Sequence, residues 1–222
     1  IDDYLYLNGG NTESVKITGD LTVNTGNTLN IQDMDLVVDG TIDIVDGGKI
    51  KVYQAGNGGT LLNNSDFELN GELDVGNGEV TVTAGFTLKP TGILTIDGGT
   101  FFRDQESQPS ASYLEGTFNL YDGIFDHTNN GYYWDCVSST ITGGIIKCRS
   151  ALLLESGDFH PTGGSVEFYG YYNSLVYCLG DNYFWDFVVN RTGNSLYLYT
   201  DLYIKNDFIV NTGWVDCQQP VK

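Results

Sequence analysis

The feature that most constrains this chain's fold is a short motif that returns along its length. The motif is Asp, then Leu or Phe, any residue, an apolar residue, and Asn or Asp. Its copies lie at residues 20–24, 35–39, 66–70, 186–190 and 207–211. The spacing is irregular but clusters near about 20 residues or small multiples of that length, which is typical of repeated structural units.

A second motif, Gly-Gly followed by any residue and an apolar residue, punctuates the chain. Its copies begin at Gly47, Gly58, Gly98, Gly143 and Gly163. Between the motifs, apolar and polar residues alternate, as in 41–45, 79–83 and 93–97. Alternation with a period of two predicts half-buried strands, and the paired glycines predict tight turns between them. No stretch has the periodicity of a confident helix.

Strands, turns and repeat length together predict a right-handed parallel β-helix with rungs of about 20 residues. Each rung would complete the backbone hydrogen bonding of its neighbour at a spacing of ~4.8 Å. The alternative is an antiparallel β-sandwich, which also has many short strands and glycine turns. Against the sandwich, matched two-residue hairpins are few and it does not explain the internal repeat.

We expect residues 1–222 to form a single solenoid domain. Aromatic residues are sparse in the first part, about 1–102, and frequent in the last part, about 114–222. The polar stretch 103–113, which contains Pro109, is predicted to be a loop between rungs.

The acidic composition excludes some partners. The formal net charge is −19, with only 10 Lys and Arg residues against 29 Asp and Glu. Such a charge repels phosphate backbones and anionic bilayers, so we expect neither nucleic-acid binding nor membrane insertion of this segment. No apolar run reaches the ~18 residues that a membrane helix needs. We expect no metal site or cofactor, although turns such as 46–48 and 77–79 could hold Ca²⁺ instead of being simply solvated.

Four cysteines, all in the second half of the chain, have two interpretations. They are Cys136, Cys148, Cys178 and Cys217. Disulfides, which would require an oxidising compartment, are the favoured interpretation, and reduced buried thiols are the alternative. The sequence does not decide which cysteines would pair.

The last 80 or so residues carry a family resemblance. Residues 163–170, 183–193 and 200–213 resemble repeats of bacterial cell-surface β-solenoid proteins of the adhesin or envelope type. In those repeats a Gly-Gly-Thr-Val-x-Phe-x-Gly turn leads into Phe-x-x-Leu-x-Ile-Asn strands. The resemblance implies a secreted, extracellular or cell-surface protein: an adhesin, a fibre or another structural component of the envelope. It supplies no functional residue, and the extra Tyr, Trp and Cys residues depart from the pattern.

Aromatic residues near the C-terminal end are the best binding candidates. Exposed rings in a row could stack on sugars, because they offer large apolar faces with polar rims. The residues singled out for this role are Tyr169, Tyr171, Tyr172, Trp185, Tyr197 and Tyr199. The alternative is that these rings fill a wide core or cap an end of the solenoid.

A polysaccharide lyase or hydrolase is a third function class, because β-helices also support these enzymes. Such a site needs clustered acids with a nearby base, yet the only Asp-Asp pair is Asp2-Asp3. His127 and His160 lack the sequence surroundings of a hydrolase site. We therefore expect no catalytic residue.

The sequence favours a structural or adhesive surface module. Nothing plainly polar or proline-rich caps residues 1–7 or 215–222. Uncapped solenoid ends are open strand edges that can pair with another copy, so end-to-end assembly into a filament is expected. The expected partners are copies of the chain or other envelope proteins, with glycans as the alternative.

Overall fold

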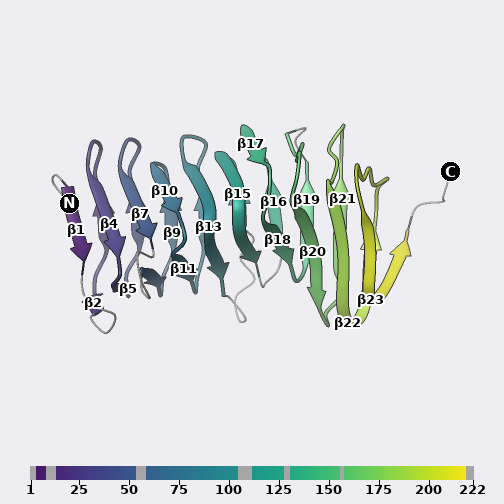
Figure 1. The fold of residues 1–222 in the computed structure, drawn as a ribbon, viewed down its shortest axis with the longest axis horizontal. Helices are drawn as coiled ribbons and strands as arrows, with labels where there is room; N and C mark the ends of the chain where they lie inside the picture. The colour runs from purple at the N-terminus through teal and green to yellow at the C-terminus, as the bar shows by residue number, and fades with distance from the viewer. Residues whose placement is uncertain are drawn as a thin grey trace.

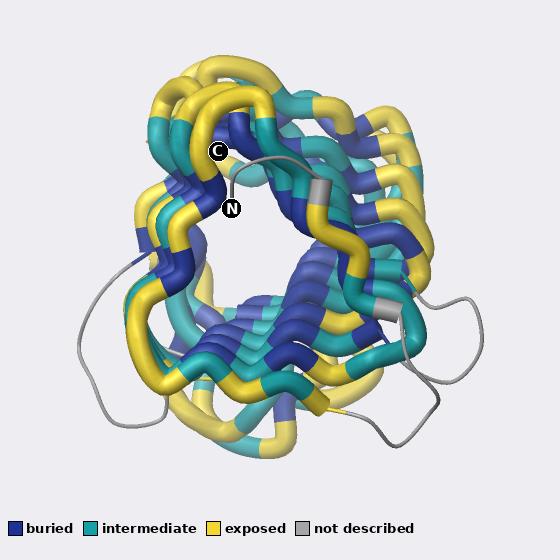
Figure 2. The backbone as a smooth tube through the Cα atoms, turned by 90° about the vertical axis from the view of Figure 1, so that its left-hand side faces the viewer, coloured by how far each residue is buried: buried dark blue, intermediate teal, exposed yellow. Residues whose placement is uncertain are grey.

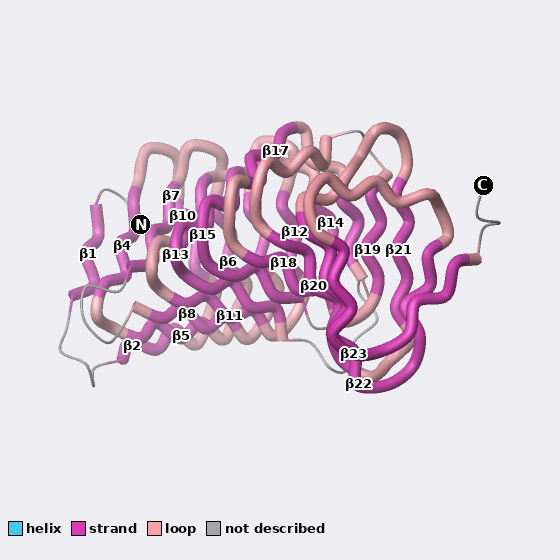
Figure 3. Tube along the Cα trace, turned by 45° about the vertical axis from the view of Figure 1, so that its right-hand side comes forward, coloured by secondary structure: helices cyan, strands magenta, loops and turns pink. Residues whose placement is uncertain are grey.

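The chain forms an elongated parallel β-solenoid of about 9 turns, with rungs about 21 residues apart (Figure 1). A computed structural model describes residues 4–8, 14–53, 59–104, 112–127, 131–155 and 158–218. Within these ranges there are 23 strands and no helix (Figure 3). The predicted solenoid is therefore confirmed, while its right-handed sense stays a prediction.

The strands stack in three ladders that run along the long axis. Ladder A contains β1 (Tyr4–Asn8), β4 (Thr28–Gln32), β7 (Lys49–Tyr53), β10 (Glu72–Val75), the first parts of β13 (Ile93–Arg103) and β15 (Thr117–His127), and β17 (Ser138–Ile141). Ladder B contains β2 (Ser14–Ile17), β5 (Asp35–Val38), β8 (Thr60–Asn63), β11 (Glu79–Val82), the second parts of β13 and β15, β18 (Ile145–Cys148), β20 (Ser165–Gly170), and the first parts of β22 (Asp186–Leu198) and β23 (Phe208–Cys217). Ladder C contains β3 (Leu21–Val23), β6 (Ile42–Ile44), β9 (Phe67–Leu69), β12 (Phe86–Leu88), β14 (Ser112–Leu114), β16 (Tyr132–Trp134), β19 (Ala151–Leu154), β21 (Ser174–Cys178), and the second parts of β22 and β23.

Every strand pairing in the described part of the chain is parallel, which excludes the antiparallel sandwich. The register keeps like residues above one another. Leu29 of β4, for example, lies between Leu5 of β1 and Ile50 of β7. Because all inward-facing positions of a ladder coincide, each rung extends one continuous core.

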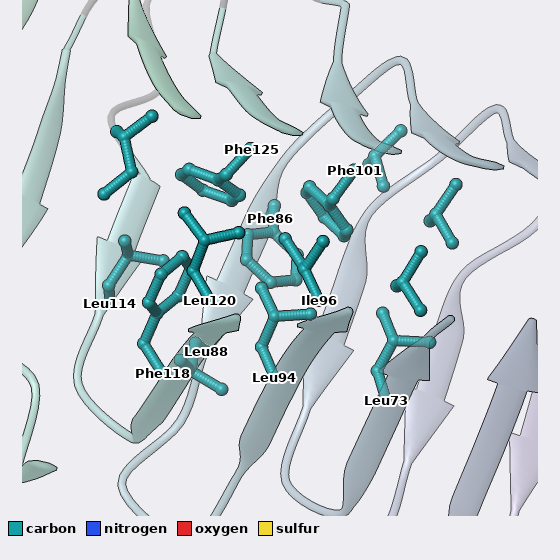
Figure 4. Close-up of a cluster of buried hydrophobic side chains, with 14 of the residues drawn as sticks. Leu73, Phe86, Leu88, Leu94, Ile96, Phe101, Leu114, Phe118, Leu120 and Phe125 are labelled. Atoms are coloured by element: carbon teal, nitrogen blue, oxygen red, sulfur yellow. The ribbon is translucent and has the colours of Figure 1, made fainter. Parts of the chain in front are cut away.

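The core gains aromatic rings among its aliphatic side chains along the axis. Alternate residues of each strand point inward, and the buried positions line the interior of the tube (Figure 2). Aliphatic side chains fill the first rungs. The rings of Phe67, Phe86, Phe101 and Phe125 then follow in series, with centroids 5.8, 4.7 and 5.5 Å apart. Figure 4 shows the last three of these rings. These contacts bury large apolar area, the main favourable term in folding.

Glycine fills corners where successive rungs approach too closely for a side chain. A Cβ on Gly92 would lie closer than 3.0 Å to the carbonyl oxygen of Leu69, and one on Gly116 would meet that of Gly92 in the same way. Both glycines sit where ladder C turns into ladder A. The tight stacking of rungs therefore selects glycine at this corner.

The two sequence motifs mark strand and corner types rather than one position in the rung. Motif copies 20–24 and 66–70 lie on ladder C, whereas copies 35–39, 186–190 and 207–211 lie on ladder B. The Gly-Gly pairs likewise occupy two different corners, and Gly58 lies outside the described residues. This explains why the motif spacing was irregular although the rung length varies by only a few residues.

The stretch predicted as a loop, 103–113, is strand at both ends. Arg103 is the last residue of β13, and Ser112 and Tyr113 open β14. Arg103 and Ser112 are fully buried, because both point into the core at the turn from ladder B to ladder C. Residues 105–111 lie outside the described residues.

Candidate functional site

A groove of about 770 Å³ opens where ladder B turns into ladder C in the last rungs. We call it the B–C corner groove. Its walls come from β22 and β23, with Asn173 contributed by the turn before β21. Its hydrogen-bonding side chains are Asn173, Thr192, Asn194, Ser195 and Thr212. Arg191, Tyr197 and Trp214 complete the side-chain lining.

Arg191 lies between two glycines of the neighbouring rungs. Its register partner on β20 is Gly170, and a Cβ on Gly213 of β23 would come within 2.7 Å of the Arg191 Cβ. The two missing side chains leave room for the arginine to turn inward. The side chain is therefore held at the groove by the rung stacking itself.

The guanidinium of Arg191 is only partly satisfied. Its Nη1 donates to the Tyr169 carbonyl oxygen at 3.3 Å and to Ser174 Oγ. Nε and Nη2 are buried and have no hydrogen-bond partner among the described residues. The residue is 1% exposed, and burial lowers the pKa of its guanidinium. A buried cation without a countercharge is costly, so this arginine needs an explanation.

Trp214 is the most exposed large hydrophobic residue of the described chain, at 79%. It pairs with Ser195 across the last two rungs, on the outer face of ladder C. The sequence does offer a signal for it. Thr-Gly-Asn at 25–27 and at 192–194 becomes Thr-Gly-Trp at 212–214. In the register the indole lies over Ser195, so it occupies a position that holds a small hydroxyl side chain in the preceding rung.

The aromatic residues predicted to bind do not form one surface. Tyr169 is half-buried on the outer side of ladder B, where its hydroxyl donates to Asp126 Oδ1 at 2.7 Å. Trp185 is half-buried beside ladder A, near Pro161. Tyr197 lies on ladder C and Tyr199 directly follows the end of β22, with ring centroids 6.4 Å apart. Of the residues singled out from the sequence, only Tyr197 lines the groove.

Tyr171 and Tyr172 lie at the same corner as the groove, one rung earlier. Both are exposed, with ring centroids 4.2 Å apart and hydroxyls 2.9 Å apart. The Arg149 guanidinium lies over both rings, at 5.6 and 5.4 Å from their centroids. Their faces are therefore partly occupied by each other and by Arg149.

A second buried polar cluster sits within the core, at the B–C turn of earlier rungs. Nε2 of His127 lies 2.8 Å from Arg103 Nη1 and 3.1 Å from Ser112 Oγ. Arg103 Nε donates to the Ala84 carbonyl oxygen at 3.0 Å. His127 is enclosed, so it cannot act as a base toward a substrate outside the solenoid. His160, the other histidine, lies 3.5 Å from Asp181 on the surface.

All four cysteines are free thiols in the structure, and the disulfides expected from the sequence stay a prediction. The register explains the free thiols: Cys148 stacks between His127 and Phe168, Cys178 on Leu154, and Cys217 on Leu198. Cys136, Cys148 and Cys178 are buried, as in the alternative interpretation, and Cys217 is exposed. Burial raises the pKa of the Cys136 thiol and raises that of Cys178 to about 11.

Across the residues that the structure describes, no group of three or more His, Cys, Asp or Glu side chains is placed to hold a metal ion. Over those same residues, no helix is long and apolar enough to cross a bilayer. The groove lining offers hydroxyls, amides, aromatic rings and one cation. Such a set can bind and orient a polar ligand.

No family model, curated protein or solved structure matches this chain. What the groove can bind is therefore inferred from the side chains that line it. Sequence reasoning missed Arg191 and Trp214 as site residues, because their significance comes from neighbours about 20 residues away.

Proposed function

We propose that this chain is a structural and adhesive module of an extracellular or cell-surface assembly, lengthened by stacking one copy on another. The observation that carries the proposal is the last described rung, β23. Its outer edge has no neighbouring strand among the described residues, and its apolar side chains are exposed.

The side chains of β23 that continue the core column are half-exposed. Phe208 stacks on Phe187 with ring centroids 5.8 Å apart, yet it is 50% exposed. Val210 follows Val189 in the register and is 48% exposed. In the preceding rung both partners are fully buried. An open apolar edge strand pairs readily with another strand, so a covering rung is expected.

The first rung of a second copy has the shape and chemistry to cover β23. Ladders B and C run through both ends of the stack, so β2 and β3 can continue the two halves of β23 in parallel register (Figure 1). At the other end, Leu5 of β1 aligns with the core residue Leu29 but is 42% exposed. Apolar ends of like cross-section favour head-to-tail stacking, which generates a filament.

Charge sets the conditions for this assembly. Each copy carries a formal net charge of −19, so copies repel one another at low ionic strength. Salt screens this repulsion within about 10 Å at 0.1 M, while apolar burial is retained. Assembly is therefore expected to strengthen as salt is added.

The surface location and the adhesive role are part of the proposal. An acidic, elongated solenoid is suited to a spacer that remains soluble while its ends pair, and the resemblance to envelope repeats supports the same role. Other envelope proteins are also proposed partners, and they would bind the same open edge strands that a second copy would cover. A lyase or hydrolase gains no support, because His127 is enclosed and the groove lining contains no acid among its described residues.

The test is analytical ultracentrifugation and negative-stain electron microscopy of the purified chain over a range of concentration and salt. Val210→Arg places a charge in the open core column and is expected to give monomers. Ile209→Arg is the matched control, because Ile209 pairs with Val188 on the outer face of the same strand. Monomeric wild type under all conditions, or equal loss of assembly in the two variants, would overturn the proposal.

A further inference from the structure

We infer that the B–C corner groove binds a short saccharide with one acidic group, its carboxylate or sulfate on Arg191 and a sugar ring on Trp214. This goes beyond the stacking proposal and does not depend on it. It assigns the groove a ligand class from three independent features: an unsatisfied cation, an exposed indole and a rim of hydrogen-bonding side chains.

The unsatisfied guanidinium is the first feature. In a chain with 29 Asp and Glu residues, none of the described residues lining the groove is acidic. Nε and Nη2 of Arg191 form a fork that matches a carboxylate or sulfate in geometry, and both atoms lack a partner within the described structure. Both atoms lie beneath the groove surface, so the lining side chains must shift to admit the acidic group, which would then satisfy both atoms and neutralise the charge.

The exposed indole is the second feature. Trp214 holds a large apolar face in water, at 79% exposure, on the outer side of ladder C. Such a face gains free energy when it covers the C–H face of a sugar ring. Unlike the rings of Tyr171 and Tyr172, no ring or cation contact is found for it among the described residues.

The rim is the third feature, and it separates a saccharide from a simple anion. Asn173, Asn194 and Thr212 supply amide and hydroxyl groups around the opening, which suit the many hydroxyls of a sugar. The left-handed backbone of Asn194, with φ of 44°, forms the tip of this corner. A volume of about 770 Å³ falls within the usual range for small-molecule sites.

Net charge limits the ligand to a short one. One arginine can neutralise one acidic group, whereas a long polyanion would also meet the negative surface of the protein. Nucleic acid is disfavoured for the same reason. The ligand is therefore an oligosaccharide end or a short unit with a single carboxylate or sulfate at the groove.

The experiment is a titration of the full chain with three probes, followed by Trp fluorescence and calorimetry. The probes are an aldobiouronic acid with one carboxylate, neocarrabiose 4-sulfate with one sulfate, and uncharged galactotriose. We expect saturable binding of at least one acidic probe, about tenfold or more tighter than galactotriose, because charge-assisted hydrogen bonds to Arg191 are lost with the neutral sugar. The carboxylate and sulfate arms identify which acid the fork prefers.

Variants assign the effect to the two residues. Arg191→Met fills the same space without a buried charge, so it is expected to fold normally and to lose the preference for acidic probes. Arg191→Lys keeps the charge without the fork and should retain only part of that preference. Trp214→Ala should weaken all three probes alike. Tyr121→Ala, which removes an exposed ring outside the groove, is the control and should change nothing.

Several results would overturn the inference: no saturable binding of any probe, equal affinity for acidic and neutral probes, or unchanged selectivity in both Arg191→Met and Arg191→Lys. Repeating the titration in the Val210→Arg background separates the two proposals. Binding that persists in this variant supports the groove whether or not the wild-type chain assembles.

Discussion

His127 accepts a hydrogen bond from Arg103 inside the solenoid: Nε2 of the imidazole and Nη1 of the guanidinium are 2.8 Å apart. Arginine can only donate, so Nε2 must be unprotonated and the ring neutral. Burial, together with the Arg103 charge, lowers the pKa of His127 to about 3. Desolvation lowers the pKa of Arg103 to about 10, so it remains charged at neutral pH.

This pair predicts an acid-sensitive core. The unfolded chain takes up a proton at His127 below pH 6.5, whereas the folded chain does not until about pH 3. Stability is therefore greatest above pH 6.5 and falls as the pH drops through this window. We expect His127 to account for a loss of about 2 kcal/mol between pH 6.5 and about pH 5, before most carboxylates titrate.

Urea unfolding at several pH values measures this loss. His127→Gln should flatten the slope in that window, and His160→Gln, which removes the surface histidine, is the control. Equal slopes in wild type and His127→Gln would show that the buried imidazole does not titrate as the structure implies.

Corner glycines should differ sharply in their tolerance of a methyl group. Gly92→Ala places a Cβ against the Leu69 carbonyl oxygen of the rung before, so we expect destabilisation of about 3 kcal/mol or more. Gly19→Ala meets nothing within 4 Å and should be neutral or slightly stabilising. Chemical denaturation compares the two, and similar midpoints for both variants would count against the stacking at this corner.

The aromatic column should dominate the stability of the middle rungs. Phe101→Ala removes a ring that contacts Phe86 and Phe125, and we expect a cost of about 3–5 kcal/mol. Phe102→Ala is the matched control, since Phe102 is the next residue of β13 and faces outward. Its cost should be much smaller. Comparable losses for the two variants in thermal unfolding would mean that the inward and outward faces are misassigned.

Thiol reactivity should separate Cys217 from the other cysteines. In the native chain we expect one thiol to react rapidly with Ellman's reagent, because Cys217 is exposed and the other three are buried. Unfolding in denaturant without reductant should release all four. Fewer than four reactive thiols in that sample would reveal a disulfide, in favour of the first interpretation of the sequence.

The strands could be predicted from the sequence because the alternation of apolar and polar residues is a local pattern. Alternation in 41–45 and 93–97 places every second side chain inward whatever the neighbouring rung contains, and β6 and β13 form there. The stretch 103–113 was misread at both ends, since Arg103 and Ser112 look like loop residues by type. Both are buried in the core, where each lies within hydrogen-bonding distance of the His127 imidazole. Such contacts between distant residues leave no local pattern in the sequence.

The candidate site was less readable for a related reason. The number of aromatic residues suggested Tyr169 and Trp185 as binding residues. In the structure Tyr169 lies on the outer side of ladder B and Trp185 lies beside ladder A, so they share no surface. Arg191 and Trp214 meet at one groove because rungs of unequal length bring residues 170, 191 and 213 into neighbouring rungs. A spacing that varies from rung to rung hides such alignments from inspection of the sequence.

Inspection of the sequence was enough to predict short alternating strands joined by glycine turns and repeated along the chain, because side-chain alternation and turn preferences act within a few residues. The tertiary structure alone decided which side chains face one another across rungs. Those contacts join residues about one turn apart, and their alignment depends on the length of every intervening corner.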